Sequence, residues 1–246
     1  QVEKEITHIT KIIEKFYAIF DLKPTYVLAT RPEKFLGEKS EWDKAETALK
    51  KAMDESGIKY EIQAGEGAFY GPKIEVHLKD SQNRDWQMGT AQLDLVMLPK
   101  QFETYYIDEN GDKKMPWVIH RAVFGSFERF IGMILEHFDG ALPAWLSPIQ
   151  VSLIPIGEKH NEYAQKLVSS LKSLKIRAKL NDQNMTMGKK IRETEIRRIP
   201  FMAVVGDKEI ENKTVSLRSL DNEKSITLSL EEFLKEISKK TKTPFI

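Results

Sequence analysis

Three basic side chains, His120, Arg121 and Arg129, interrupt an otherwise apolar segment at residues 119–132, IHRAVFGSFERFIG. Ser126 can accept a hydrogen bond from the third backbone N–H of a helix that begins after it, which places Arg129 in the first turn. The helix dipole makes a cation at that position unfavourable by roughly 0.3–1 kcal/mol. Arg129 is therefore either a solvated surface residue or part of an anion or nucleotide site. His120, at the end of an apolar strand, is either a hydrogen-bonded core residue or a ligand.

A glycine-rich segment at residues 64–73, AGEGAFYGPK, is a second candidate. Its spacing fits neither the dinucleotide-binding fingerprint nor the Walker loop. It is either an ordinary turn between strands or the wall of an open pocket. In the second case Tyr70 lines the pocket and Lys73 supplies a point charge for a carboxylate or a phosphate.

Polar residues also alternate with apolar ones along residues 86–94, WQMGTAQLD. Gln87, Thr90 and Gln92 form either a surface face or a set of buried groups that need hydrogen-bond partners. Gly89 has no side chain, so it can allow a β-bulge or the close approach of a ligand to the backbone.

Charge is distributed unevenly along the chain. Residues 1–147 carry 19 Lys and Arg against 24 Asp and Glu, a net of −5, whereas residues 148–246 carry 19 against 13, a net of +6. A group of basic residues surrounds the helix expected at 188–198: Lys189, Lys190, Arg192, Arg197 and Arg198. The group is either the solvated face of that helix or a contact for a polyanion such as nucleic acid.

Hydrophobic spacing predicts the elements that position the first group of candidates. We expect helices at 1–20, 40–56 and 126–138, strands at 24–30, 58–63, 73–78 and 84–95, and a hairpin over 104–120. Ser40 and Asp43 fit a capping box for the second helix. The third helix is expected to bury Phe127, Phe130, Ile131, Ile134 and Phe138. Short turns between successive strands predict an antiparallel meander.

The pattern changes after the two prolines of residues 140–150. Strands at 149–154, 176–180 and 201–205 alternate with helices at 160–174 and 188–198, and a hairpin (214–228) and a helix (230–240) follow. This alternation predicts a small α/β domain with partly parallel pairing. The chain is thus expected to be an α+β protein with one domain at 1–142, a linker at 143–148 and a second domain at 149–246.

Composition narrows the class of protein further. The chain has no cysteine, so it can form neither a disulfide nor a thiolate metal site by itself. Its apolar runs are far too short to span a membrane, and its first twenty residues do not resemble a signal peptide. These features favour a cytoplasmic location. Because the chain begins with Gln rather than Met, we expect it to be a fragment of a longer protein.

Five segments in order resemble one family. GEGAFYGPKIE, DWQMGTAQLD and VIHRAVFGSFERFIG, together with ATRPEKFLGEKSEWDKAE before them and IRETEIRRIPFMAVVGDKE after them, look like the catalytic core and anticodon-binding domain of the threonyl-tRNA synthetases. The resemblance covers nearly the whole chain. It implies a class II synthetase fold, which is an antiparallel sheet with flanking helices, followed by the α/β anticodon-binding domain.

The resemblance also implies roles for single residues. Arg129, within GSFER, corresponds to the arginine that packs on adenine and reaches the terminal phosphates, and Gln87 and Lys73 join it as catalytic residues. Tyr70, Thr90, Gln92 and Ser126 correspond to residues around ATP and threonine, and His120 corresponds to one of three zinc ligands. Positions that contact anticodon bases are matched in the second domain by Asn184, Arg192, Glu209 and Arg218.

The implied reaction is the activation of threonine with ATP and Mg²⁺ and the transfer of threonine to the 3′ end of its tRNA, by a homodimer. Zinc that binds the threonine hydroxyl would reject valine, which an apolar pocket separates poorly. The chain departs from the family at residues 183–187, which puts the anticodon contacts in doubt. It also lacks two class motifs and two zinc ligands, so we expect it to be inactive alone. The alternative is a non-catalytic, tRNA-binding relative.

Overall fold

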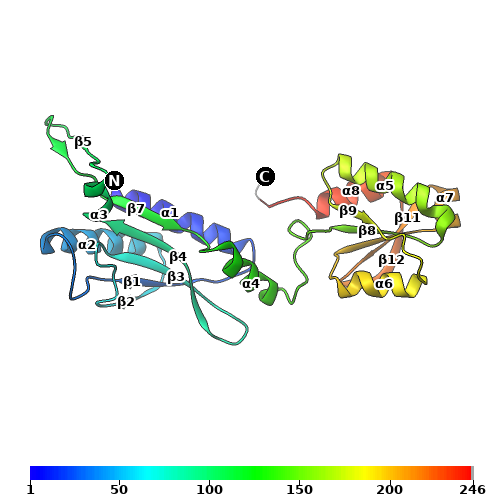
Figure 1. Ribbon diagram of the computed structural model, residues 1–246, viewed down its shortest axis with the longest axis horizontal. Helices are drawn as coiled ribbons and strands as arrows, with labels where there is room; N and C mark the ends of the chain where they lie inside the picture. The colour runs from blue at the N-terminus through cyan, green and yellow to red at the C-terminus, as the bar shows by residue number, and fades with distance from the viewer. Residues whose placement is uncertain (245–246) are drawn as a thin grey trace. The chain divides into compact units, whose positions relative to one another are not determined.

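The computed structural model describes residues 1–244, and the chain divides into two compact units, with the second beginning at Phe138. Each unit is described by itself (Figure 1). No helix in the described part of the chain is long and apolar enough to cross a membrane. The α+β class expected from the sequence is confirmed.

The first unit is built on a five-stranded sheet with the order β2-β1-β3-β4-β7. Its elements are α1 (Val2–Ala18), β1 (Thr25–Ala29), α2 (Lys39–Ser56), β2 (Tyr60–Gln63), β3 (Lys73–Lys79), β4 (Asp85–Asp94), α3 (Met97–Gln101), the small hairpin β5 (Tyr106–Ile107) and β6 (Lys113–Lys114), β7 (Val118–Ala122) and α4 (Phe127–His137).

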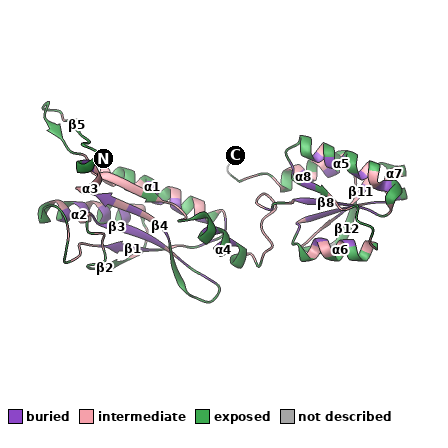
Figure 2. Cartoon of the chain, viewed as in Figure 1, coloured by how far each residue is buried: buried purple, intermediate pink, exposed green. Residues whose placement is uncertain are grey.

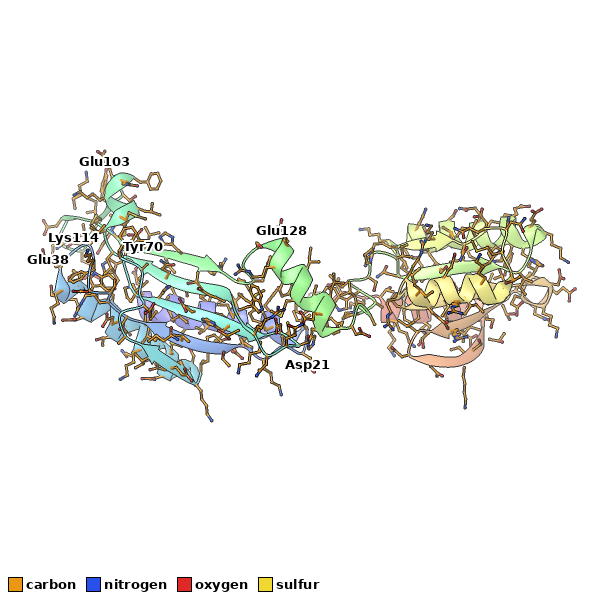
Figure 3. All side chains as sticks on the ribbon, turned by 60° about the horizontal axis from the view of Figure 1, so that its bottom comes forward. Asp21, Glu38, Tyr70, Glu103, Lys114 and Glu128 are labelled. Atoms are coloured by element: carbon orange, nitrogen blue, oxygen red, sulfur yellow. The ribbon has the colours of Figure 1, made fainter. Side chains whose placement is uncertain are left out.

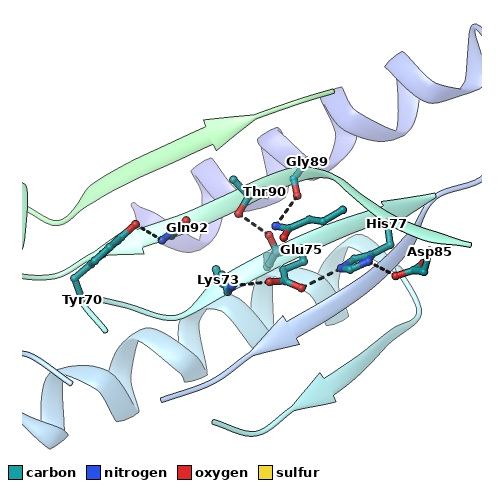
Figure 4. Close-up of polar contacts among 10 residues, drawn as sticks. Tyr70, Lys73, Glu75, His77, Asp85, Gly89, Thr90 and Gln92 are labelled. Carbon is teal, nitrogen blue, oxygen red and sulfur yellow. Dashed lines mark hydrogen bonds and ion pairs between the residues drawn. The ribbon is translucent and has the colours of Figure 1, made fainter. Parts of the chain in front are cut away.

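Two helices cover one face of this sheet, and the other face carries the polar residues (Figures 2 and 4). The side chains between the helices and the sheet recur at helical spacing in α1 and α2 and at every second residue in β3. Those that are fully buried include Ile6, Ile13, Trp42, Leu49, Ile74 and Val76. Burying each of these side chains contributes roughly 1.5–3 kcal/mol. The helices therefore fix one face of the sheet as core and leave the other for chemistry.

The strand expected at 58–63 does not join an antiparallel meander. β2 pairs parallel to β1, with Tyr26 opposite Tyr60, whereas β1, β3, β4 and β7 pair antiparallel. The 18 residues of α2 connect β1 to β2, and a helical crossover of that length lets the second strand run in the same direction as the first. The meander expected from the sequence is therefore wrong for this strand.

The ends and faces of two helices also differ from the expectation. α2 begins at Lys39 without a side-chain cap, and Asp43 bonds to Arg31 and Lys39 instead, so the capping box at Ser40 is wrong. α4 packs through Phe130, Met133 and Ile134, as these lie on one face. Phe127 (71% exposed) and Ile131 (49% exposed) lie on the neighbouring face, so their expected burial is wrong.

The second unit has a sheet with the order β12-β11-β10-β8-β9, in which β10, β8 and β9 are parallel. Its elements are β8 (Val151–Pro155), the 3₁₀ turn η1 (Glu158–His160), α5 (Asn161–Ser173), β9 (Ala178–Leu180), α6 (Met187–Ile196), β10 (Phe201–Val205), α7 (Asp207–Asn212), β11 (Thr214–Ser219), β12 (Asn222–Ser229) and α8 (Leu230–Lys240). α5 and α8 lie on one side of the sheet and α6 on the other (Figure 1). The expected α/β organisation is confirmed.

The segment expected to be a linker runs along the second unit. Arg177 donates from Nε to the carbonyl oxygen of Ser147 (2.9 Å) and from Nη2 to that of Trp145 (2.7 Å). Gln150 donates from Nε2 to the carbonyl oxygen of Ala144 (2.8 Å). The domain limits and the linker at 143–148 stay predictions.

Candidate functional site

A β-bulge brings the three polar residues of β4 onto one face of the sheet. In the register of β3 and β4, Gln92 is opposite Lys73, Thr90 is opposite Glu75, and Gln87 is opposite His77. The register shifts between the pairs at Gly89 and Gln87, because Met88 is an extra residue that turns into the core. In a regular strand with no bulge, alternation would place Gln87 on the face opposite Thr90 and Gln92. The bulge expected at Gly89 is confirmed.

Gly89 also meets a neighbouring backbone. A Cβ atom at this position would lie 2.8 Å from the carbonyl oxygen of Val123 and 2.9 Å from that of Ala122. The segment after β7 can therefore pass close to β4 only because residue 89 is glycine. This contact positions Ser126 and the beginning of α4 beside the outer half of β4.

A chain of charged groups follows β3 on the polar face (Figure 4). Lys73 Nζ lies 2.6 Å from Glu75 Oε1, and Glu75 Oε2 lies 2.9 Å from His77 Nε2. His77 Nδ1 is 2.6 Å from Asp85 Oδ2. Thr90 donates from Oγ1 to the carbonyl oxygen of Ile74 (3.1 Å). The candidate Lys73 is thus held by a carboxylate that is itself held by a histidine.

Glu75 is the buried centre of this chain and is only 7% exposed. Burial alone would raise the pKa of Glu75, but hydrogen bonds from Lys73 and His77 outweigh it and hold the pKa below its usual range. Glu75 therefore remains ionised at neutral pH. Glu75 was not singled out from the sequence, although strand alternation places it on the same face as Lys73.

Tyr70 lies at one end of the polar face. The tight turn before β3 brings it there, since a Cβ on Gly71 would lie 1.6 Å from the carbonyl oxygen of Leu93. Gln92 donates from Nε2 to the Tyr70 hydroxyl (2.5 Å), and the rings of Tyr70 and His120 are 5.8 Å apart. His120 is opposite Gln92 in the register of β4 and β7. Tyr70, Gln92 and His120 thus form one cluster.

Asp94 contacts this cluster through His120. It was not singled out from the sequence. Its side chain is fully buried and accepts hydrogen bonds from the backbone N–H groups of Val96, Met97 and Leu98. His120 Nε2 is 3.3 Å from Asp94 Oδ2. When His120 donates its Nε2 proton to Asp94, Nδ1 keeps the lone pair for a donor or a metal.

A zinc site needs three or four ligands, and the cluster does not supply them. Within residues 1–244, no group of three His, Cys, Asp or Glu side chains is placed to hold a metal ion. The carboxylate next to His120 is already bonded to three backbone N–H groups. The described residues therefore do not fit a zinc ion by themselves, and His120 offers a single imidazole.

Arg129 lies at the other end of the unit. Figure 3 labels Tyr70 near one end of the first unit and Glu128, the neighbour of Arg129, near the other. Ser126 Oγ accepts from Arg129 N (3.3 Å), which confirms the N-cap. The Arg129 guanidinium donates from Nη1 to the carbonyl oxygen of Gln87 (2.9 Å) and lies 5.5 Å from the centre of the Trp86 ring.

Trp86 is held in place by Asp80. The indole Nε1 donates to Asp80 Oδ2 (2.9 Å), and Arg84 donates to the same carboxylate. Burial would raise the pKa of Asp80, but hydrogen bonds from Trp86 and Arg84 outweigh it and lower the pKa to about 2. Trp86 is opposite Leu78, whose side chain is buried in the core. Arg129 is therefore held against the partly exposed ring of Trp86, near the beginning of β4.

The first-unit candidates consequently form two groups rather than one. Lys73, Thr90 and the Tyr70 cluster share the polar face, whereas Arg129 borders a hollow of about 340 Å³ together with Asp80, Trp86 and Glu136. Gln87 connects the groups, because its side chain faces the polar row and its carbonyl oxygen binds Arg129. A larger hollow of about 1010 Å³ lies beside the β5–β6 hairpin and contains none of the candidates.

The four candidates of the second unit are dispersed. Arg218 on β11 is paired with Glu195 of α6 (2.6 Å), so it belongs to the α6 side of the sheet. Glu209 accepts from Gly206 N (2.9 Å) and caps α7. Asn184 and Arg192 are exposed. Lys190, by contrast, is only 4% exposed and donates to the carbonyl oxygen of Pro155, so it is not part of a basic surface.

Comparison with known proteins matches both units. Residues 1–138 match the family described as tRNA synthetase class II core domain (G, H, P, S and T), and residues 150–240 match the family described as anticodon binding domain. The polar face of the first unit's sheet is therefore part of a synthetase core. The chain belongs to the class II aminoacyl-tRNA synthetase family.

Within that family, the chain is similar to threonine–tRNA ligases, as expected. The enzyme of Caldanaerobacter subterraneus subsp. tengcongensis is 46% identical over 99% of this chain and 38% of its own length. That of a Sulfurihydrogenibium species is 49% identical over 96% of this chain and 37% of its own length. The chain thus spans less than two fifths of the length of these relatives.

Solved structures agree with the fold. The RNA binding domain of threonyl-tRNA synthetase from Cryptosporidium parvum has a TM-score of 0.92 at 35% identity, covering 100% of this chain and 62% of that one. A putative threonyl-tRNA synthetase from Aeropyrum pernix has a TM-score of 0.72 at 26% identity, covering 98% and 62%.

Proposed function

We propose that this chain carries the amino-acid and nucleotide face and the anticodon-reading domain of a threonine–tRNA ligase. The activity is the activation of threonine by ATP with Mg²⁺ and the transfer of threonine to its tRNA. The observation that carries the proposal is the register of β3, β4 and β7, which gathers Lys73, Thr90, Gln92 and His120 on one face. The similarity to named threonine–tRNA ligases favours this function over a non-catalytic tRNA-binding relative.

Threonine is assigned to the end of the face near Tyr70. The Tyr70 hydroxyl and the Gln92 amide form a polar wall there, and the His120 ring lies beside them. One imidazole does not make a zinc site. Zinc remains a prediction that needs ligands other than the described residues.

ATP is assigned to the stretch from Lys73 to Gln87. Lys73 and Thr90 would contact the phosphates and the sugar, and Ser126 would keep the first turn of α4 in place through its cap. Arg129 would stack on adenine and reach the terminal phosphates. For this, the guanidinium must leave the Gln87 carbonyl oxygen and the Trp86 ring, which one rotation of a long side chain can achieve. The negative charge of ATP offsets the unfavourable position of Arg129 at a helix N-terminus.

Trp86 provides a direct test of this movement. ATP added to the chain should change the fluorescence of Trp86, because the cation that lies on the indole moves away. Arg129→Lys should abolish most of the change, while Arg121→Lys, at an exposed position on β7, should leave it intact. Equal responses of both variants would remove Arg129 from the proposed site.

The second unit is assigned to the anticodon. Asn184, Arg192, Glu209 and Arg218 would contact its bases, with the forked guanidinium of an arginine suited to guanine edges. We expect Arg192→Gln to reduce the preference of the chain for threonine tRNA over the same tRNA with a changed anticodon. A variant that keeps the full preference would contradict the assignment.

Catalysis is expected to need more than this chain. The chain alone should not exchange pyrophosphate into ATP with threonine, and robust exchange would overturn this expectation. A homodimer and a cytoplasmic location likewise remain predictions.

A further inference from the structure

A basic hollow in the second unit has no role in the proposed reaction. Its volume is about 340 Å³, and it lies where the chain enters β8 and β9 and where α5 and α8 end. We define the basic hollow by six of its lining residues: Trp145, Lys175, Arg177, Ser238, Thr241 and Lys242.

The two segments that meet at the basic hollow contain no acidic residue near it. Residues 163–181 include five Lys and Arg, and residues 237–244 include three Lys, with no Asp or Glu in either stretch. Helix dipoles favour lysines in the last turn of a helix. Lys175 and Lys242 lie two residues beyond the ends of α5 and α8, so the dipoles favour cations there as well.

The positive charges of the basic hollow are also not neutralised. Lys166 and Lys240 each pair with a glutamate one turn away on their own helix. Lys175, Arg177 and Lys242 form no ion pair with a carboxylate anywhere in residues 1–244. Arg177 is fixed in direction by its bonds to two carbonyl oxygens. Arg177, held by these two bonds, and the two lysines therefore line the same hollow.

The basic hollow is separate from the candidates for anticodon reading. α5 and α8 cover one side of the sheet, whereas Arg218 pairs with Glu195 of α6 on the other side. Asn184 and Glu209 follow the carboxyl ends of β9 and β10, while Arg177 precedes β9. A ligand in the basic hollow would therefore contact a different part of an RNA from the bases that those residues read.

We propose that the basic hollow binds the phosphodiester backbone of RNA, as a contact that does not depend on base sequence. The proposal deepens the proposed function, since it adds a second tRNA-binding surface to the same unit. Charge complementarity supports this occupant, since three cations that form no ion pair within residues 1–244 match the negative charge of phosphate oxygens. A contact of this kind adds affinity for any RNA that reaches it.

The test compares two double variants of the whole chain. Lys175→Gln with Lys242→Gln removes two charges from the basic hollow. Lys213→Gln with Lys224→Gln removes two charges from exposed positions next to β11 and on β12. The probes are a transcript of a threonine tRNA and the same transcript with a changed anticodon. Dissociation constants are measured at several salt concentrations between 0.05 and 0.3 M, chosen as roughly the range in which phosphate contacts are sensitive to salt.

The hollow variant should bind both transcripts roughly tenfold to sixtyfold more weakly at about 0.1 M salt, since each contact contributes about 0.9 to the slope of log K against log salt. The slope of its log K against log salt should become less steep by about 2, and its preference between the transcripts should not change. The control variant should behave as the original chain. An unchanged slope in the hollow variant, or an equal fall in the control, would overturn the proposal.

Two results separate this proposal from the proposed function. In the first, the hollow variant shows the smaller slope of log K against log salt, but the original chain does not prefer either transcript. This result supports the backbone contact and contradicts the anticodon assignment. An unchanged slope in the hollow variant, in a chain that still prefers the threonine transcript, keeps the anticodon assignment and overturns the backbone contact.

Discussion

Replacing Asp94 by asparagine tests the support beneath the Tyr70 cluster. Asp94 Oδ1 accepts from Val96 N (3.1 Å) and Met97 N (2.7 Å), and Oδ2 accepts from Leu98 N (3.1 Å) and faces His120 Nε2 at 3.3 Å. Asparagine can keep the first pair through its own oxygen. Its amide group then presents N–H to the Leu98 N–H, so one backbone donor loses its acceptor inside the protein.

The expected cost follows from these bonds. A hydrogen bond to a charged group contributes about 1.5–3 kcal/mol, and a buried donor left without an acceptor costs about 1–3 kcal/mol. Asp94→Asn should therefore lower the free energy of unfolding of the first unit by about 2–4 kcal/mol. With a urea dependence of about 2 kcal/mol per molar, the midpoint should fall by about 1–2 M.

Urea unfolding followed by tryptophan fluorescence measures this change. Three of the four tryptophans, Trp42, Trp86 and Trp117, belong to the first unit, so the signal reports mainly on it. Asp108→Asn is the matched control. Asp108 accepts from the N–H groups of Asn110 and Asp112 through a single oxygen in an exposed turn, and asparagine keeps that oxygen. A midpoint for Asp94→Asn within about 0.25 M of the original, or an equal fall for Asp108→Asn, would refute the reasoning.

Gly89→Ala should destabilise the first unit by about 1–3 kcal/mol, because its Cβ would lie 2.8 Å from the Val123 carbonyl oxygen. Gly132→Ala is the control: its Cβ would meet open space in α4, so it should stabilise the unit by about 0.5–1 kcal/mol. Thermal unfolding of the two variants checks this, and equal melting temperatures would contradict the close approach at Gly89. The pKa of Glu75 is lowered in the folded state, so its contribution to stability is present above the pKa of an unfolded glutamate, near 4.3, and is lost as the pH falls through the folded value. Glu75→Gln should therefore flatten the acid limb of the stability profile below about pH 4.5, and an unchanged acid limb would show that Lys73 and His77 do not hold this carboxylate.

Some features of the first unit were predictable from the sequence and others were not. The strand that contains Gln87, Thr90 and Gln92, the cap at Ser126 and the bulge at Gly89 were predictable, because each depends on neighbours within a few residues. The face of α4 was not. Its apolar residues form two adjacent stripes, and only Phe130, Met133 and Ile134 are buried, with the Phe130 ring packed against Phe16 and Phe20.

The charged partners of Lys73 were only partly predictable. Glu75 and His77 follow Lys73 at every second residue of β3, so strand alternation places them on its face, whereas Asp85 reaches His77 only through the pairing of β3 with β4. The same holds for Asp94, which is separated from His120 by 26 residues and meets it through the pairing of β4 with β7. Contacts of this range depend on strand register, which local spacing does not specify.

By itself, the sequence determined the α+β class, the change of rhythm after residue 140, the basic second half and the family to which the chain belongs, since these depend on composition, periodicity and ordered motifs. Only the tertiary structure decided that Arg129 rests on Trp86 near the beginning of β4, that Lys190 is buried, and that Lys175 and Lys242 face one hollow. The reason is physical: charges act over distances in space, and the fold sets which of them are close.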